Sequence, residues 1–75
     1  MVELDLHNHR HDEAKRLLET TLNSLWGSNE ELEIITGNSS KMKDIVVDIL
    51  DEYKLHYNIG DWTGQNMGFI KTVLD

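Results

Sequence analysis

The sequence predicts a two-layer α+β sandwich in which two helices cover one face of a four-stranded mixed sheet. Short runs of alternating or β-branched apolar residues, typical of strands, lie at residues 2–6, 32–36, 55–59 and 68–74. Two longer segments, residues 11–26 and 42–53, carry their apolar residues at helical spacing. The resulting order, β-α-β-α-β-β with single-faced helices, places both helices on the same side of the sheet.

The first strand and the first helix are each defined by one periodic pattern. In residues 2–6 polar and apolar side chains alternate, so Leu4 and Leu6 share one face and Asp5 lies on the other. The helix over residues 11–26 has an apolar stripe made of Ala14, Leu17, Leu18, Leu22 and Leu25. Gly27 ends the helix, since glycine is favoured just past a helix C-terminus.

The second half of the chain repeats the strand-helix pattern and adds a hairpin. Turn-forming residues 37–40 separate the strand at 32–36 from a helix with an apolar stripe. The stripe comprises Met42, Ile45, Val46, Ile49, Leu50 and Tyr53. Leu55, Tyr57 and Ile59 alternate as the third strand, residues 60–66 form a polar loop, and residues 68–74 close a hairpin.

Length and composition restrict the class of protein. Seventy-five residues fit one domain, residues 1–75, because the remainder could not build a second core. The chain has no cysteine, which excludes disulfides and thiolate metal sites, and no apolar segment reaches the ~18 residues of a membrane helix. We expect a cytoplasmic monomer that does not enter a membrane and needs no cofactor.

The charge is acidic overall but unevenly distributed. Seven basic and 14 acidic residues give a net charge of −7, which argues against a protein that binds polyanions through charge alone. Most of the basic residues nevertheless fall in the opening turns of the two helices, namely Arg10, Lys15, Arg16, Lys41 and Lys43. An acidic chain with one locally basic end is therefore predicted.

Asp5 and His7 form the first candidate site. Residues two apart on a strand point the same way, so the two side chains can approach each other. A carboxylate that accepts one ring N–H fixes the imidazole tautomer and leaves the other nitrogen free as a base. The structural alternative is that Asp5 accepts backbone N–H groups in the loop while His7 packs against Trp26 or Tyr53.

Several motifs together resemble the Smr (small MutS-related) domain, over nearly the whole chain. They are Leu4-Asp5-Leu6-His7, then Asp12-Glu13-Ala14 at the start of a helix, then Ile34-Ile35-Thr36-Gly37 before a second helix. Asn8 stands where the family usually has glycine, and the second motif lacks its second glycine. The resemblance implies the fold of the C-terminal domain of translation initiation factor three, with strand order 1-2-4-3 and the fourth strand antiparallel to the others. It also implies that Asp5 and His7 occupy positions used in nucleic-acid cleavage.

The turn after the second strand is the second candidate site. If the first two strands are parallel, their carboxyl ends lie together beside the N-termini of both helices, where α/β sheets bind ligands and anions are favoured. The predicted nucleic-acid and phosphate ligands are Arg10, Thr36, Gly37, Asn38, Ser39, Ser40, Lys41 and Lys43. The alternative is an ordinary strand-to-helix turn in which a serine caps the helix.

Two further features carry weaker hypotheses. His7, His9 and His11 would share a face and could clamp a metal if the strand extended through all three, but a helix start near His11 breaks this alignment, so we predict no metal site. Trp62, in the polar loop, could stack on an unpaired base or fold back onto the sheet.

Two functions follow from these residues. The first is a nucleic-acid hydrolase, an endonuclease or ribonuclease of the Smr type acting on DNA or RNA, with His7 as general base and Asp5 orienting it. The second is a module that binds nucleic acid or a protein partner without cutting. The acidic balance and the altered glycine motif favour the second.

Overall fold

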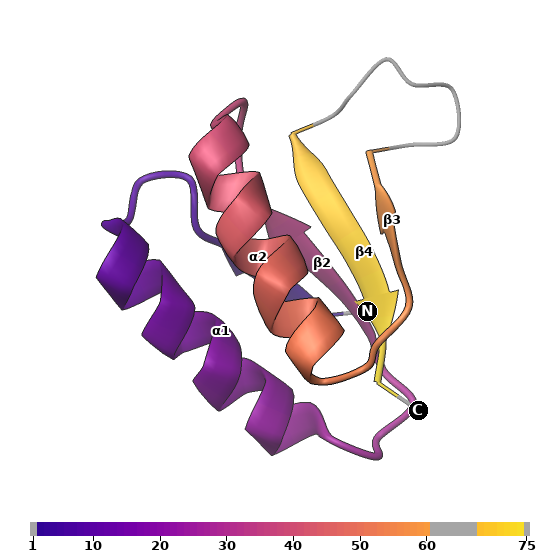
Figure 1. Ribbon diagram of the computed structural model, residues 1–75. Helices are drawn as coiled ribbons and strands as arrows, with labels where there is room; N and C mark the ends of the chain where they lie inside the picture. Colours follow the sequence, from indigo (N-terminus) through magenta and orange to yellow (C-terminus); the bar gives the residue numbers. More distant parts are fainter. Residues whose placement is uncertain (1, 61–67, 75) are drawn as a thin grey trace.

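Six elements make up the fold, in the order that the sequence predicts. In the computed structural model, which describes residues 2–60 and 68–74, they are β1 (Val2–Asp5), α1 (His11–Leu25), β2 (Glu31–Ile35), α2 (Ser40–Glu52), β3 (Tyr57–Ile59) and β4 (Phe69–Val73) (Figure 1). The α+β class is confirmed. Trp62 and most of the loop at residues 60–66 lie outside the described residues, so the stacking hypothesis stays a prediction.

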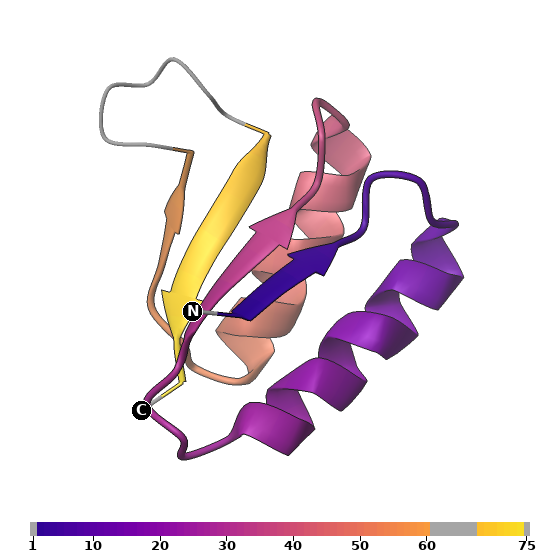
Figure 2. The ribbon, with the colours of Figure 1, turned by 180° about the vertical axis from the view of Figure 1, so that it is seen from behind.

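The four strands form one mixed sheet in the order β1-β2-β4-β3, as the Smr resemblance implies. β1 pairs with β2 in parallel, and β4 runs antiparallel to both of its neighbours. Figure 2 shows β1 and β2 pointing the same way, toward the end of the molecule where α1 and α2 begin. The carboxyl ends of two strands and the N-termini of two helices therefore share one end.

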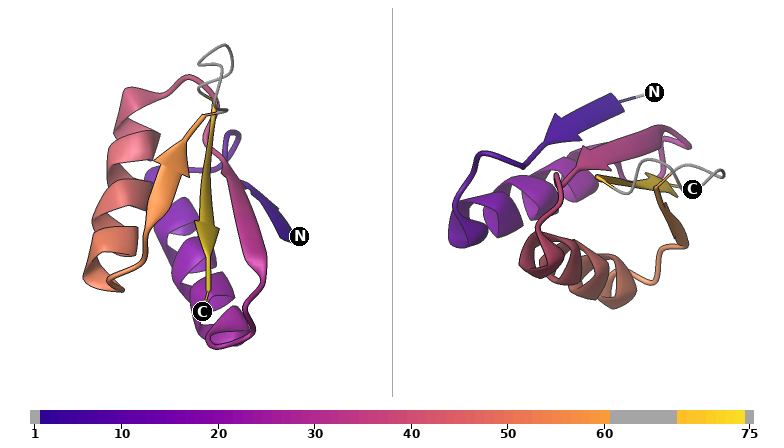
Figure 3. Two further views of the ribbon diagram at one scale, coloured as in Figure 1. Left: turned by 90° about the vertical axis from the view of Figure 1, so that its right-hand side faces the viewer. Right: turned by 90° about the horizontal axis from the view of Figure 1, so that it is seen from above.

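Both helices pack on one face of the sheet, so the molecule has two layers (Figure 3). The strand pattern agrees with this arrangement, because Leu32 and Ile34 of β2 are fully buried while the intervening Glu33 is only half-buried. Among the described residues, no helix is long and apolar enough to cross a membrane.

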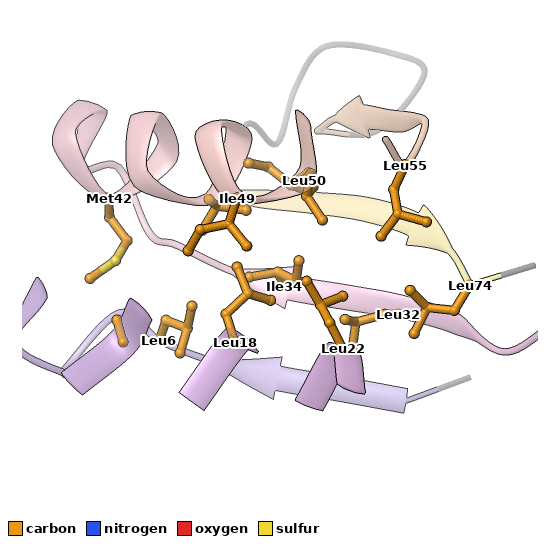
Figure 4. Close-up of a cluster of buried hydrophobic side chains, with 13 residues drawn as sticks. Leu6, Leu18, Leu22, Leu32, Ile34, Met42, Ile49, Leu50, Leu55 and Leu74 are labelled. Carbon is orange, nitrogen blue, oxygen red and sulfur yellow. The ribbon is translucent and has the colours of Figure 1, made fainter. Parts of the chain in front are cut away.

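The core lies between the sheet and the two helices. Figure 4 shows Leu18 and Leu22 of α1 and Ile49 of α2 pointing toward the strand residues Leu32 and Ile34. Each of these side chains is at most 2% exposed. The apolar stripes predicted from helical spacing are thus the surfaces that join helix to sheet.

Two residues of the predicted apolar faces are exposed instead. Leu17 is 36% exposed, because the buried positions of α1 are Ala14, Leu18 and Leu22 and Leu17 lies about 100° around the helix from Leu18. Ile59 is 40% exposed, because β3 is an edge strand and has no neighbour on its outer side to cover its side chains.

The exposed Leu17 supplies a matched control for the core. Leu18→Ala and Ile49→Ala should each lower the free energy of unfolding by about 2–5 kcal/mol, since each truncates a side chain buried in the core of a small domain. Leu17→Ala makes the same chemical change on the same helix and should cost about 1 kcal/mol or less. Urea denaturation of the three variants checks this, and equal losses for Leu17 and Leu18 would contradict the assigned helix face.

Candidate functional site

Parallel pairing of β1 with β2 brings the two predicted motifs together. Asp5 pairs with Ile35, and the Leu6 N–H donates to the Ile35 carbonyl at 2.8 Å. The residues that follow these two strands then come together. A Cβ atom placed on Gly37 would lie only 3.2 Å from the Cβ of His7. Residues 30 positions apart in sequence thus come into near contact beyond the ends of the strands.

Asp5 and His7 interact directly, as predicted, although His7 lies in the turn after β1 and not on the strand itself. Asp5 Oδ1 accepts the backbone N–H of His7 at 3.1 Å, and the same oxygen is bonded to His7 Nδ1 of the ring. The His7 and Asp5 side chains are 44% and 52% exposed, so both are accessible to a ligand. Trp26 and Tyr53, the alternative packing partners for His7, pack on each other with ring centroids 5.8 Å apart.

The two bonds to His7 also determine the charge of Asp5. The side-chain hydrogen bond with His7, followed by the backbone bond, lowers the pKa of the Asp5 carboxyl below its ordinary value. Asp5 therefore stays ionised at neutral pH and can only accept hydrogen bonds. Nδ1 must then carry the ring hydrogen, and in a neutral imidazole this leaves Nε2 with a free lone pair.

Thr36 and Gly37 are held by the backbone of Gly68, the residue just before β4. The amides of Thr36 and Gly37 donate to the Gly68 carbonyl at 2.8 and 2.9 Å. Thr36 is only 1% exposed. Its hydroxyl oxygen lies 3.0 Å from the carbonyl oxygen of Gly37 and 3.2 Å from that of Gly68. These donors, which the sequence assigns to phosphate binding, are engaged inside the fold.

The remaining turn residues, Asn38, Ser39 and Ser40, are exposed. Ser39 is the N-cap of α2, and its hydroxyl oxygen accepts the Met42 N–H at 3.1 Å. The predicted serine cap of this helix is therefore present, and whether the turn also binds phosphate stays a prediction. A cap satisfies one of the free amides of a helix N-terminus and leaves the first amides, those of Ser40 and Lys41, without an intrahelical acceptor.

The predicted basic ligands lie at the same end of the molecule. Arg10 is the N-cap residue of α1, where its side chain is 88% exposed and its Nε atom lies 4.0 Å from Asp12 Oδ1. Lys41 is exposed in the first turn of α2, and Lys43, two residues further along the helix, is half-buried. The structure thus places positive charge beside both helix N-termini.

The three histidines do not form the row that a metal clamp needs. β1 ends at Asp5, and the chain then turns, with the His9 N–H donating to the Leu6 carbonyl at 3.1 Å. His9 Nδ1 instead contacts Glu13 Oε1 at 2.7 Å. Within residues 2–60 and 68–74, no group of three or more histidine, cysteine or acidic side chains is arranged to hold a metal.

A shallow groove runs from His7 along the helix-free side of the sheet. Its lining consists of His7, Glu33, Ile35, Gly37, Asn38, Gly68 and Phe69. Sequence reasoning missed Phe69 and Gly68, because they reach the site only when β4 pairs with β2 and brings Phe69 opposite Ile35. The charged Glu33 inside an apolar strand was the one local signal that this face is open.

The Asp5–His7 bonds predict a pH-dependent stability. Because the folded pKa lies below its ordinary value of 3.8, the carboxylate stabilises the fold above that pH and loses its effect as pH falls through the folded pKa. Asp5→Asn should therefore destabilise the protein slightly at pH 6, because the pair is about half exposed, and the difference should shrink as the pH falls below 3.8. Glu3→Gln, two residues earlier on the same exposed face, is the control. Urea titrations of both variants over this pH range test the assignment, and a pH-independent loss for Asp5→Asn would contradict it.

Comparisons with known proteins bear on the fold. No family model and no curated protein matches the chain. Among solved structures, it is similar to the solution structure of the B3BP Smr domain, with a TM-score of 0.66 and 26% sequence identity, over 97% of this chain and 77% of that one. This similarity agrees with the strand order β1-β2-β4-β3 and with the motifs around Asp5 and Thr36. The chain has the Smr-domain fold.

Proposed function

We propose that the protein is a nucleic-acid phosphodiesterase of the Smr type, in which His7 is the general base. The observation that carries the proposal is the paired contact of Asp5 with His7. One carboxylate oxygen holds both the backbone and the ring of the same histidine, on an exposed rim. A base must be accessible, correctly tautomeric and fixed in orientation, and this pair supplies all three properties.

The chemistry needs one proton transfer at His7. Nε2 accepts a proton from an attacking water or from a ribose 2′-hydroxyl, and the oxygen so activated forms a new bond to phosphorus. The bond from phosphorus to the leaving oxygen breaks, and that oxygen takes a proton from solvent. The imidazolium that forms on His7 lies against the ionised Asp5, which stabilises its positive charge.

The substrate phosphates are bound by the α2 N-terminus and the basic residues beside it. The first amides of α2, at Ser40 and Lys41, lack intrahelical acceptors and favour an anion. Lys41 and Arg10 add exposed positive charge at this end, and Asn38 and Ser39 present polar groups on the same turn. Binding through a few local contacts suits a chain whose net charge is −7.

A second candidate function is supported by one observation. The amides of Thr36 and Gly37 are bonded to Gly68, so they are not free to stabilise charge on a reacting phosphate. A domain that retains the basic end but lacks these donors could bind nucleic acid, or a protein partner, without cutting. Incubation of the purified protein with labelled single-stranded RNA and duplex DNA, with and without chelator, distinguishes binding from cleavage.

His7 should be required for cleavage but not for stability. His7→Ala removes a base from an exposed position and should lower the cleavage rate by about 10²- to 10⁴-fold, with little change in oligonucleotide affinity or in the midpoint of thermal unfolding. His56→Ala, which removes an exposed histidine just before β3, is the matched control. Normal cleavage by His7→Ala would show that the base is misassigned, while a wild-type protein that binds but never cuts would support the binding module.

Lys41 should contribute to binding in a salt-dependent way. Lys41→Ala removes one exposed charge beside the α2 N-terminus and should weaken oligonucleotide binding while lowering the salt slope of the affinity by about one unit. Lys54→Ala removes an exposed charge past the other end of α2 and should leave both quantities nearly unchanged. Fluorescence anisotropy at several salt concentrations measures them. Equal effects of the two substitutions would mean that binding is not localised at the basic end.

A further inference from the structure

The turn formed by Thr36 and Gly37 lies directly against the His7 side chain. Gly37 has a positive φ of +66°, and a Cβ atom on it would lie 3.2 Å from the Cβ and 4.0 Å from the Cγ of His7. A side chain at residue 37 would therefore meet two obstacles, since the backbone conformation disfavours it and His7 occupies the space. Only glycine lets the two loops approach this closely.

The same turn is fixed from its other side by one carbonyl. Gly68 accepts the amides of Thr36 and Gly37 at 2.8 and 2.9 Å, and the Thr36 hydroxyl is 3.2 Å from the same oxygen. A hydroxyl has a single hydrogen, which here is shared between the carbonyls of Gly37 and Gly68. Thr36 is 1% exposed, so its hydroxyl cannot also reach a ligand.

We propose that Thr36 and Gly37 are positioning residues that hold His7 in place against Asp5, and that they do not contact the substrate. Gly68 fixes the turn, Gly37 lets the turn lie close to His7, and the Asp5 oxygen holds the histidine ring. The effect on cleavage rests on the proposed function of His7. The effect on the geometry of His7 does not.

A matched pair of glycines makes the proposal testable. Gly27 has a φ of +78°, similar to that of Gly37, but a Cβ atom on it would meet nothing within 4 Å. Gly27→Ala and Gly37→Ala therefore introduce the same backbone strain, and only Gly37→Ala presses on His7. Any difference between the two variants at His7 comes from the added methyl group against His7 rather than from a weakened fold.

Ring ¹⁵N spectra of His7 and the ¹³C titration of the Asp5 carboxyl report the geometry without any substrate. In Gly37→Ala, the His7 ring signals should shift and Asp5 should titrate at a higher pH than in the wild type, because its bonds to His7 are disturbed. Gly27→Ala should match the wild type in both measurements. Unchanged His7 and Asp5 signals in folded Gly37→Ala would overturn the proposal, whether or not the protein cuts nucleic acid.

Thr36 provides the second arm of the test. Thr36→Val keeps the shape of the side chain but loses the hydroxyl, whereas Thr36→Ser keeps the hydroxyl. We expect Thr36→Val to move the His7 signals and Thr36→Ser to leave them as in the wild type. In cleavage assays, Gly37→Ala and Thr36→Val should lower kcat by roughly tenfold with KM unchanged, since a displaced base slows chemistry without weakening binding. A raised KM with normal kcat would instead show that the turn contacts the substrate.

Discussion

Parallel pairing of β1 with β2 is the constraint on which the candidate site depends. The register Leu4 with Ile34 and Asp5 with Ile35 decides which residues meet beyond the strand ends. A slip of one residue would turn every side chain of β1 to the opposite face and bury Asp5 while exposing Leu6. Burying an ionised carboxylate without a partner is costly, so the same pattern that builds the core also fixes the site.

Leu6 joins the hydrophobic core to the candidate site. It lies between Asp5 and His7, is fully buried, and donates its N–H to Ile35 on the neighbouring strand. The two side chains of the candidate site, Asp5 and His7, thus flank an anchored residue, although both are exposed. A site built this way can change its polar residues with little effect on stability, because the residues that stabilise the fold point the other way.

The sequence predicts the elements well because each depends on a local pattern. Helical spacing and strand alternation locate all six elements, and the Asp5–His7 contact follows from a separation of two residues. Strand order required the Smr resemblance, since periodicity does not say which strands are neighbours. Leu17 was misplaced because spacing gives the width of an apolar stripe but not which of its edges touches the sheet.

The engagement of Thr36 and Gly37 shows where local reasoning stops. Their partner, Gly68, is 32 residues away from Thr36 and arrives only because β4 inserts between β2 and β3. A turn rich in glycine and hydroxyl groups has the same local signature whether its donors face a phosphate or a carbonyl of its own chain. The serine cap on α2 was among the predicted alternatives because it depends on residues only three apart, Ser39 and Met42.

On the proposed function, the occupied turn limits which groups of this acidic domain can hold nucleic acid. With Thr36 and Gly37 bonded to Gly68, the backbone donors that remain at this end include the first amides of α2, beside Lys41. Asp5 is ionised and lies close to that end, so a phosphate approaching without compensation would be repelled. The backbone and ring N–H groups of His7 donate to Asp5 and stabilise its negative charge. On the proposed function, the same bonds that orient the base therefore weaken this repulsion where an anionic substrate would bind.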